Sequence, residues 1–212
     1  MKILSVKSLA IEDVKVIRFA RFADERGYFT EPYRRSDTVG HPDLKGFSSL
    51  QFVQINESFS KRGVCRGLHF QWNPYMGKLV RTTQGHMVDL VLDIRKGSPT
   101  LGKITAFDMA TAVSDNYSEW IWVPPGFAHG NFFTEDSRIE YLCSGEYSPG
   151  CEAGISPLAK DLDWSLCPDE LRQMFDTTVR ASGLLSEKDR NGLTLEQWLS
   201  DSRSENFVYG VC

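Results

Sequence analysis

The sequence predicts an all-β fold, a sandwich or barrel with a few short helices, mainly near its C-terminal end. Three observations support this prediction. Short apolar and β-branched runs recur along most of the chain, Gly, Pro, Asn and Asp separate them, and helical patterns occur only late. The 212 residues match the size of one large domain, and 41% hydrophobic content is enough for a buried core. We expect a single domain over residues 1–212, with its core at about 10–165 and a helical part at about 166–212.

The expected strands follow one another at short spacing, as they do in sandwiches and barrels. Between residues 88 and 95, apolar and charged side chains alternate, which predicts a strand with one apolar and one polar face. This segment stops at Gly97-Ser98-Pro99, and another turn signal occurs at Asp24-Glu25-Arg26-Gly27. The other expected strands are Val14–Phe19, Phe52–Ile55, Leu101–Met109, Glu119–Val123, Gly130–Phe133 and Arg138–Cys143.

Helical pattern is confined to two late segments. The first is Glu170–Phe175 and the second is Thr194–Leu199. In the second, Thr194 and Gln197 have the spacing of a capping box, which marks a helix start.

Charge and cysteine usage narrow the class of protein. A net charge of −4 gives no general affinity for nucleic acid or an anionic membrane, so an anionic ligand must be bound by local cations. The five cysteines, at positions 65, 143, 151, 167 and 212, are odd in number and lack CxxC spacing, which predicts reduced thiols. The charged N-terminal region and the lack of an 18-residue apolar span predict a cytoplasmic protein.

Polar residues concentrate in two otherwise strand-like segments, 66–81 and 124–130. Because buried charge is costly, such clusters indicate catalysis or anion binding. In the first segment, His69 is either a hydrogen-bonded core imidazole or a general base whose tautomer is held by a carboxylate. The sequence leaves four candidates for that carboxylate, Asp89, Asp93, Asp163 and Asp189.

The cations near His69 could bind an anionic ligand or could be ordinary surface residues. Arg66 suits phosphate or carboxylate oxygens, and Lys61, Arg62 and Arg81 could complete an anion site. Strict alternation would place Arg66 and His69 on opposite faces, but a bulge at Gly67 would turn both inward. Two other residues have plain alternatives, because Lys78 could be an exposed strand-edge lysine and His129 could satisfy loop backbone groups.

A metal site is disfavoured but left open. His69-Phe70-Gln71 lacks a second histidine two residues on, and no Glu follows at a spacing that completes a His/His/Glu set.

Several motifs in the same order resemble the dTDP-4-dehydrorhamnose 3,5-epimerase family over residues 24–189. They are residues 24–31 (DERGYFTE), 52–58 (FVQINES), 63–71 (GVCRGLHFQ), 78–81 (KLVR), 93–102 (DIRKGSPTLG), 124–130 (PPGFAHG), 141–155 and 185–189 (LSEKD). The resemblance implies a cupin-type jelly-roll or β-sandwich barrel that uses no cofactor and no metal. It also implies a homodimer with strands exchanged or sites completed across the interface.

The resemblance assigns roles by motif. His69 is similar to the family's general base, Asp189 to its dyad partner, and Tyr141, six residues before Tyr147, to the acid on the opposite face. Lys78 and His129 resemble the groups near the sugar's keto oxygen. The remaining substrate contacts implied are Arg26, Phe29, Glu31, Gln54, Asn56, Arg66 and Glu152.

The implied activity is an isomerase reaction in deoxysugar biosynthesis. It inverts C3, C5 or both on a nucleoside-diphosphate 4-keto-6-deoxy sugar of the dTDP-4-dehydro-6-deoxyglucose type. A proton next to a ketone is weakly acidic, so its removal needs a base and groups that stabilise the enolate. Two alternatives stay open: a metal-dependent cupin isomerase or oxygenase with His69 and His129 as ligands, and a non-catalytic nucleotide-sugar binding module.

Overall fold

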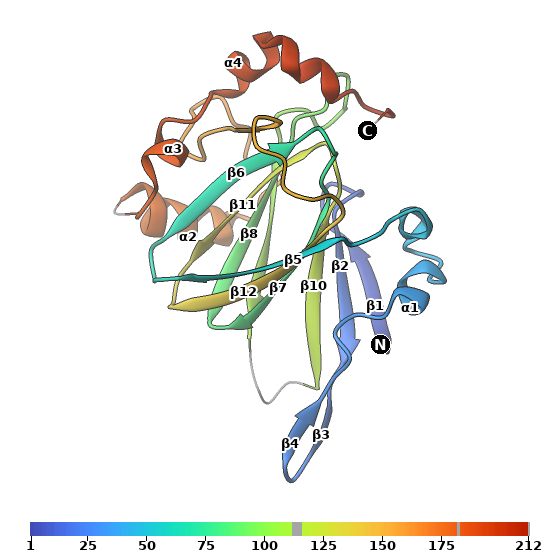
Figure 1. The fold of residues 1–212 in the computed structure, drawn as a ribbon. Helices are drawn as coiled ribbons and strands as arrows, with labels where there is room; N and C mark the ends of the chain where they lie inside the picture. The colour runs from blue at the N-terminus through green and yellow to red at the C-terminus, as the bar shows by residue number, and fades with distance from the viewer. Residues whose placement is uncertain (112–115, 182, 212) are drawn as a thin grey trace.

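Two antiparallel sheets pack face to face in the computed structural model, which describes residues 1–111, 116–181 and 183–211 (Figure 1). The six-stranded sheet has the order β1 (Ile3–Ser8), β2 (Lys15–Ala20), β10 (Tyr117–Val123), β7 (Lys78–Gln84), β12 (Ser137–Cys143), β5 (Gln54–Ser60). The five-stranded sheet has the order β13 (Glu152–Gly154), β6 (Cys65–Gln71), β11 (Phe127–Phe133), β8 (His86–Asp93), β9 (Ile104–Ala110). The expected all-β sandwich is confirmed.

The helices are short and most of them follow the strands. Only α1 (Arg35–Val39) and the 3₁₀ helix η1 (Lys45–Ser48) precede β5. The C-terminal elements are α2 (Asp169–Phe175), η2 (Asp176–Arg180), α3 (Glu187–Arg190), α4 (Leu195–Ser200) and η3 (Ser202–Asn206). Both predicted helices are present, and Thr194 and Gln197 form the expected capping box of α4.

Three apolar clusters hold these layers together. One lies between the sheets and joins residues such as Val80 and Ile139 to Val91 and Phe133. A second packs the C-terminal elements against the five-stranded sheet, and a third packs the segment 33–52 against the six-stranded sheet. The five-stranded sheet is therefore covered on both faces, as continuously buried strands require.

The predicted polar face of strand β8 is wrong, because both of its faces are buried. Asp89 and Asp93 are fully buried, and polar partners compensate for the burial of each carboxylate. Asp93 accepts hydrogen bonds from Arg95, Ser98 and Thr100, whereas Asp89 pairs with a histidine of the neighbouring strand. Charge in a strand therefore does not indicate exposure when each carboxylate has a buried partner.

The predicted bulge at Gly67 is confirmed. In the pairing of β6 with β11, His69 lies opposite His129 and Arg66 opposite Asn131, so two residues of β6 face Gly130 alone. Gly67 has φ +112°, and a Cβ placed on it would lie 2.5 Å from the Gly130 Cα. The two glycines thus permit a close backbone contact that turns Arg66 and His69 into the same cavity.

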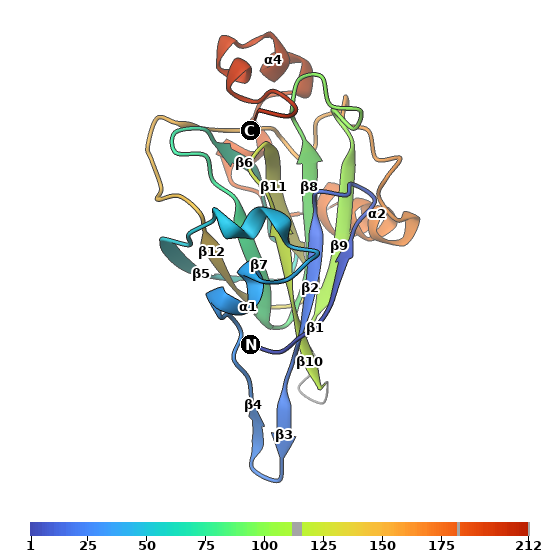
Figure 2. The same cartoon turned by 90° about the vertical axis from the view of Figure 1, so that its right-hand side faces the viewer.

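A two-stranded hairpin of β3 (Phe22–Asp24) and β4 (Gly27–Phe29) projects from the sandwich, at the end away from α4 (Figures 1 and 2). Its turn occupies the predicted position, at residues 24–27. Phe22, Tyr28 and Phe29 are exposed on it, which is unusual for three aromatic side chains so close together.

Candidate active site

Two adjoining chambers lie between the two sheets and together form one candidate cavity. The outer chamber, of about 610 Å³, is lined by residues that include Gln54, Asn56, Gln71, Met76, Tyr147 and Glu152. The inner chamber, of about 190 Å³, is lined by residues that include Ser58, Arg66, His129, Asn131, Ile139 and Asp189. His69, Lys78 and Tyr141 line both chambers, so the most chemically capable side chains stand where the chambers meet.

His69 and Asp189 form a close pair in this cavity. His69 Nε2 lies 2.6 Å from Asp189 Oδ1, and the imidazole is 35% exposed whereas the carboxylate is 7% exposed. An ionised carboxylate only accepts hydrogen bonds, so Nε2 carries a proton, and in the neutral form of the imidazole Nδ1 keeps its lone pair. Of the four open candidates, Asp189 is therefore the carboxylate that holds the His69 tautomer.

The short helix α3 positions Asp189. Ser186 caps this helix by accepting a hydrogen bond from the Asp189 backbone N–H at 3.1 Å. Burial alone would raise the pKa of Asp189, but hydrogen bonds from His69, Ser186 and the Gly67 N–H, with the imidazole charge, outweigh it and lower the pKa. Asp189 is thus an anion beside His69 at neutral pH.

A second histidine–carboxylate pair lies deeper in the sandwich. His129 Nε2 is 2.9 Å from Asp89 Oδ2, and both side chains are buried. In a neutral imidazole whose Nε2–H donates to Asp89, the Nδ1 atom keeps its lone pair. The loop-satisfying alternative for His129 is wrong, since the residue lies within β11 and lines the inner chamber.

Lys78 begins β7 and lies inside the cavity, so the exposed strand-edge alternative is also wrong. Burial lowers the pKa of its ammonium group, while the charges of Cys143, Asp89 and Glu152 work in the opposite direction. No side-chain hydrogen bond to Lys78 occurs among the described residues, so its ammonium is available to a ligand.

Tyr141 approaches the cavity from the other sheet. It belongs to β12 of the six-stranded sheet, whereas His69 belongs to β6 of the five-stranded sheet. Burial and the neighbouring Cys143 raise the pKa of its phenol, and Asn56 and Arg66 offset part of that rise. The phenol therefore stays protonated at neutral pH and can donate.

Polar side chains organise the outer chamber. Gln54 Nε2 donates to Asn56 Oδ1 at 3.0 Å, and Gln54 Oε1 accepts from the Tyr147 backbone N–H at 2.9 Å. Glu152 accepts from the Tyr147 hydroxyl at 3.0 Å and from Lys188 Nζ at 2.9 Å. The expected contacts Gln54, Asn56, Arg66 and Glu152 thus all reach the cavity.

Three expected substrate contacts do not reach the cavity of their own chain. Arg26 lies in the turn of the β3–β4 hairpin, pairs with Asp24, and has an 84% exposed side chain. Phe29 is exposed on β4, and Glu31 pairs with Arg34 and the N-terminal amine. Within one chain, these residues form no part of the site.

The predicted local cluster of cations is wrong for three of its four members. Arg66 lines the inner chamber and donates to Ser60 Oγ at 2.9 Å. Arg81 instead pairs with Glu140, while Lys61 and Arg62 are exposed in the turn after β5. Alternation along β7 explains why Arg81 does not reach the cavity. Arg81 is three residues from Lys78, so the two side chains face opposite sides of the sheet.

Sequence reasoning missed several residues of this site. Tyr147 and Lys188 flank Glu152 at the outer chamber, and Ser58 and Asn131 line the inner one. Asn131 had a visible signal, because it is a lone amide within the strand-like run Gly130–Phe133. The others sit inside quoted motifs but carry no pattern of their own.

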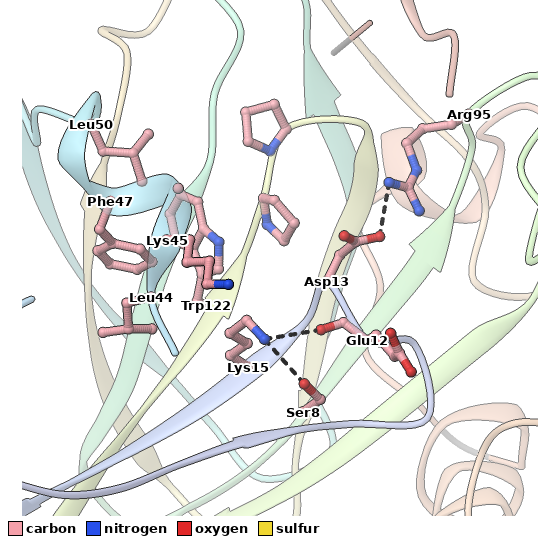
Figure 3. Close-up of a pocket in the computed structure, with 13 residues that line it drawn as sticks. Ser8, Glu12, Asp13, Lys15, Leu44, Lys45, Phe47, Leu50, Arg95 and Trp122 are labelled. Carbon is pink, nitrogen blue, oxygen red and sulfur yellow. Dashed lines mark hydrogen bonds and ion pairs between the residues drawn. The ribbon is translucent and has the colours of Figure 1, made fainter. Parts of the chain in front are cut away.

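Another cavity, of about 460 Å³, lies beside η1 and the turn between β1 and β2 (Figure 3). Leu44, Phe47 and Trp122 form an apolar wall in it. Its charged groups are largely engaged, because Arg95 pairs with Asp13, and Lys15 donates to Ser8 Oγ and the Glu12 carbonyl. Its described lining holds the carboxylates of Glu12 and Asp13 but lacks the histidine–carboxylate pair of the cavity between the sheets.

Among the residues that the structure describes, no group of three or more His, Cys, Asp and Glu side chains could hold a metal ion. No helix in the described ranges has the length and apolar character needed to cross a membrane. Cys65, Cys143, Cys151 and Cys167 are free, and Cys212 lies outside the described residues.

The fold and cavity together define a β-sandwich enzyme whose site holds groups suited to general acid–base chemistry, namely a histidine–carboxylate pair, a buried ammonium and a facing phenol. Comparison with known proteins identifies the enzyme family. The family model described as dTDP-4-dehydrorhamnose 3,5-epimerase matches residues 8–197, and the chain belongs to this family. It is an isomerase of the cupin-like β-sandwich type.

Individual relatives agree with this assignment. The dTDP-4-dehydrorhamnose 3,5-epimerase of Pseudomonas aeruginosa is 37% identical over 188 residues, which cover 87% of this chain and 92% of that protein. The Legionella pneumophila dTDP-6-deoxy-D-glucose-3,5-epimerase, in complex with dTDP-4-keto-L-rhamnose, has a TM-score of 0.76 at 30% identity, covering 96% and 97% of the two chains. A Streptomyces bikiniensis 3'-monoepimerase, in complex with dTDP-quinovose, has a TM-score of 0.67 at 27% identity, covering 93% and 88%.

Proposed function

We propose that this protein epimerises a nucleoside-diphosphate 4-keto-6-deoxy sugar, of the dTDP-4-dehydro-6-deoxyglucose type, at C3, C5 or both, as a step in deoxysugar biosynthesis. The observation that carries the proposal is the placement of His69, paired with Asp189, and of Tyr141 on opposite sheets around one cavity. Inversion at carbon requires a base on one face of the sugar and an acid on the other, and these two residues can supply both.

In the proposed first half-reaction, His69 removes the proton from the carbon next to the ketone. Its Nδ1 is the basic nitrogen, because Nε2–H donates to Asp189. Negative charge then develops on the keto oxygen. The Lys78 ammonium and the partly buried cavity favour that charge, since a cation in a site with little water stabilises an enolate strongly. His129 is proposed to lie near the same oxygen.

In the second half-reaction, Tyr141 donates its phenolic proton to the opposite face of the planar carbon. Its raised pKa keeps the proton available at neutral pH. The phenolate formed is reprotonated from solvent, and the proton held by His69 is released to solvent. No net oxidation or reduction occurs, so the cycle balances without a redox cofactor.

The outer chamber is the proposed place for the nucleotide and its diphosphate. Gln54 and Asn56 line this chamber and offer amides, and Arg66 presents a guanidinium fork suited to phosphate oxygens from the adjoining inner chamber. Tyr147 is 54% exposed at the rim, where a ring can contact a nucleobase. The complexes of the Legionella and Streptomyces enzymes with dTDP-sugars support a nucleotide sugar as the ligand.

We further propose a homodimer in which the β3–β4 hairpin of one chain completes the site of its partner. Arg26, Phe29 and Glu31 are the residues concerned, because they lie outside the cavity of their own chain. An exposed aromatic hairpin that projects from the body suits a contact with a second copy (Figures 1 and 2). The single domain over residues 1–212 and the cytoplasmic location stay predictions.

Incubation with dTDP-4-dehydro-6-deoxyglucose in D₂O tests the proposal. We expect deuterium at C3, C5 or both by NMR, an inverted product, and unchanged rates with a chelator. Loss of activity on chelation would favour the metal-dependent cupin alternative. Binding of the nucleotide sugar without exchange would favour the non-catalytic binding module. The deuterated positions also decide which centres invert.

A further inference from the structure

The inner chamber contains hydrogen-bonding groups that have no partner. Asn131 is 4% exposed, and its Oδ1 is buried without a hydrogen bond in the described residues. Ser58 Oγ, from β5 on the other sheet, is buried and unpartnered as well. Both residues line the same chamber. Buried polar atoms are normally satisfied, so each orphan calls for an explanation.

Asn131 lies within β11 and lines the inner chamber. Its strand position also fixes the side chain, because Asn131 pairs with Asp89 on one side and Arg66 on the other. The amide therefore stands in the chamber wall, where its Oδ1 has no partner among the described residues.

The chemistry of these groups selects their ligand. A carboxamide both donates and accepts, and a serine hydroxyl does too. A methyl group placed there would leave them unsatisfied, which is costly in a buried site. A hydroxyl group can donate to one and accept from the other. Apart from these atoms, the chamber also has the apolar side chain of Ile139 in its wall.

We propose that Asn131, assisted by Ser58, is a specificity-determining residue that binds one hydroxyl group of the substrate sugar. The inference rests on the proposed function, since the inner chamber adjoins His69, Lys78 and Tyr141. A 4-keto-6-deoxyhexose linked through C1 has hydroxyl groups only at C2 and C3. The site thus selects a sugar that carries the hydroxyl over its deoxy counterpart.

The test compares three substrates, dTDP-4-dehydro-6-deoxyglucose and its 2-deoxy and 3-deoxy counterparts, by the kcat/KM of deuterium exchange next to the ketone. In the unmodified enzyme, removal of the bound hydroxyl should lower kcat/KM about 10- to 100-fold. In Asn131→Leu, which keeps the size of the side chain, this penalty should shrink to about threefold or less. The penalty for the other hydroxyl should not change.

Ile139→Val is the matched control, because it trims the same chamber without altering its polarity and should preserve both penalties. If Asn131→Leu fails to fold, as judged by thermal unfolding, Ser58→Ala provides the same comparison. Equal losses on all three substrates would overturn the proposal, as would a water that stays on Asn131 in a crystal structure of the substrate complex. Absence of exchange by the unmodified enzyme on every substrate would instead reject the proposed function.

Discussion

His69 and Tyr141 face one cavity from opposite sheets of the sandwich, His69 from β6 and Tyr141 from β12. In the proposed mechanism, this relationship separates removal of a proton from its replacement. If both groups stood on one side, a proton removed could only return to the same face, and the carbon would keep its configuration. Exchange with solvent and inversion can therefore be measured as separate properties of the two residues.

Tyr141→Phe should retain more solvent exchange than net inversion, because His69 still forms the enolate while the second-face donor is lost. The checks are deuterium incorporation and product configuration by NMR. His69→Ala should lower both by about 10²- to 10⁴-fold while thermal unfolding stays near that of the unmodified protein. Equal losses of exchange and inversion in Tyr141→Phe would count against its role as donor.

The sequence predicted the strands around the site better than the contacts within it. Lys78 lies in the strand-like segment 66–81 and starts strand β7, and the expected bulge at Gly67 follows from glycine's freedom at positive φ. The partner of His69 could not be read from any pattern, since Asp189 lies 120 residues away and joins it only through the packing of α3. Residue resemblance, rather than periodicity, indicated that pair.

The contacts of Asp189 should make part of the stability depend on pH. Its pKa is lowered in the folded state, from about 3.9 in an unfolded chain, so its stabilisation is complete above that value. The stabilisation is lost as the pH falls through the folded pKa. Asp189→Asn should therefore lower the free energy of unfolding by about 1–3 kcal/mol at pH 7 and by much less near pH 2. Urea unfolding at the two pH values measures this, and a pH-independent difference would contradict it.

The Lys78 ammonium should lower the free energy of unfolding while it supports activity. Burial lowers the pKa of its ammonium, so the charged form destabilises the folded state at neutral pH. Because the unfolded chain then holds the proton more tightly, stability should rise with pH between the lowered pKa and about 10.4.

Lys78→Met removes this charge and keeps much of the side-chain volume. It should raise the free energy of unfolding at pH 7 by about 1 kcal/mol and lower exchange by about 10²- to 10³-fold. Denaturant unfolding from pH 7 to 10 should show the rise with pH in the unmodified protein and its absence in the variant. A less stable Lys78→Met protein would show that the ammonium is held by favourable contacts instead.

The projecting hairpin predicts complementation between two inactive chains. Arg26→Ala damages the hairpin, whereas His69→Ala damages the cavity. If each site combines the cavity of one chain with the hairpin of its partner, a mixed dimer has one native site and one doubly altered site. Random mixing should then restore about a quarter of the unmodified activity, because about half of the dimers are mixed and each has one of two sites intact.

A second mixture gives the matched control. His69→Ala and Tyr141→Phe both alter the cavity, so every site in a mixed dimer contains one of the two changes whichever chain supplies the hairpin. Co-expression with two different affinity tags isolates the mixed dimers, and D₂O exchange with inversion gives the activity. Recovery in the first mixture alone fits a site shared between chains. If Arg26 completes the partner's site, each isolated mixed dimer of Arg26→Ala with His69→Ala has one site with a native cavity and a native hairpin. Inactivity of these mixed dimers would therefore place Arg26 outside the partner's site.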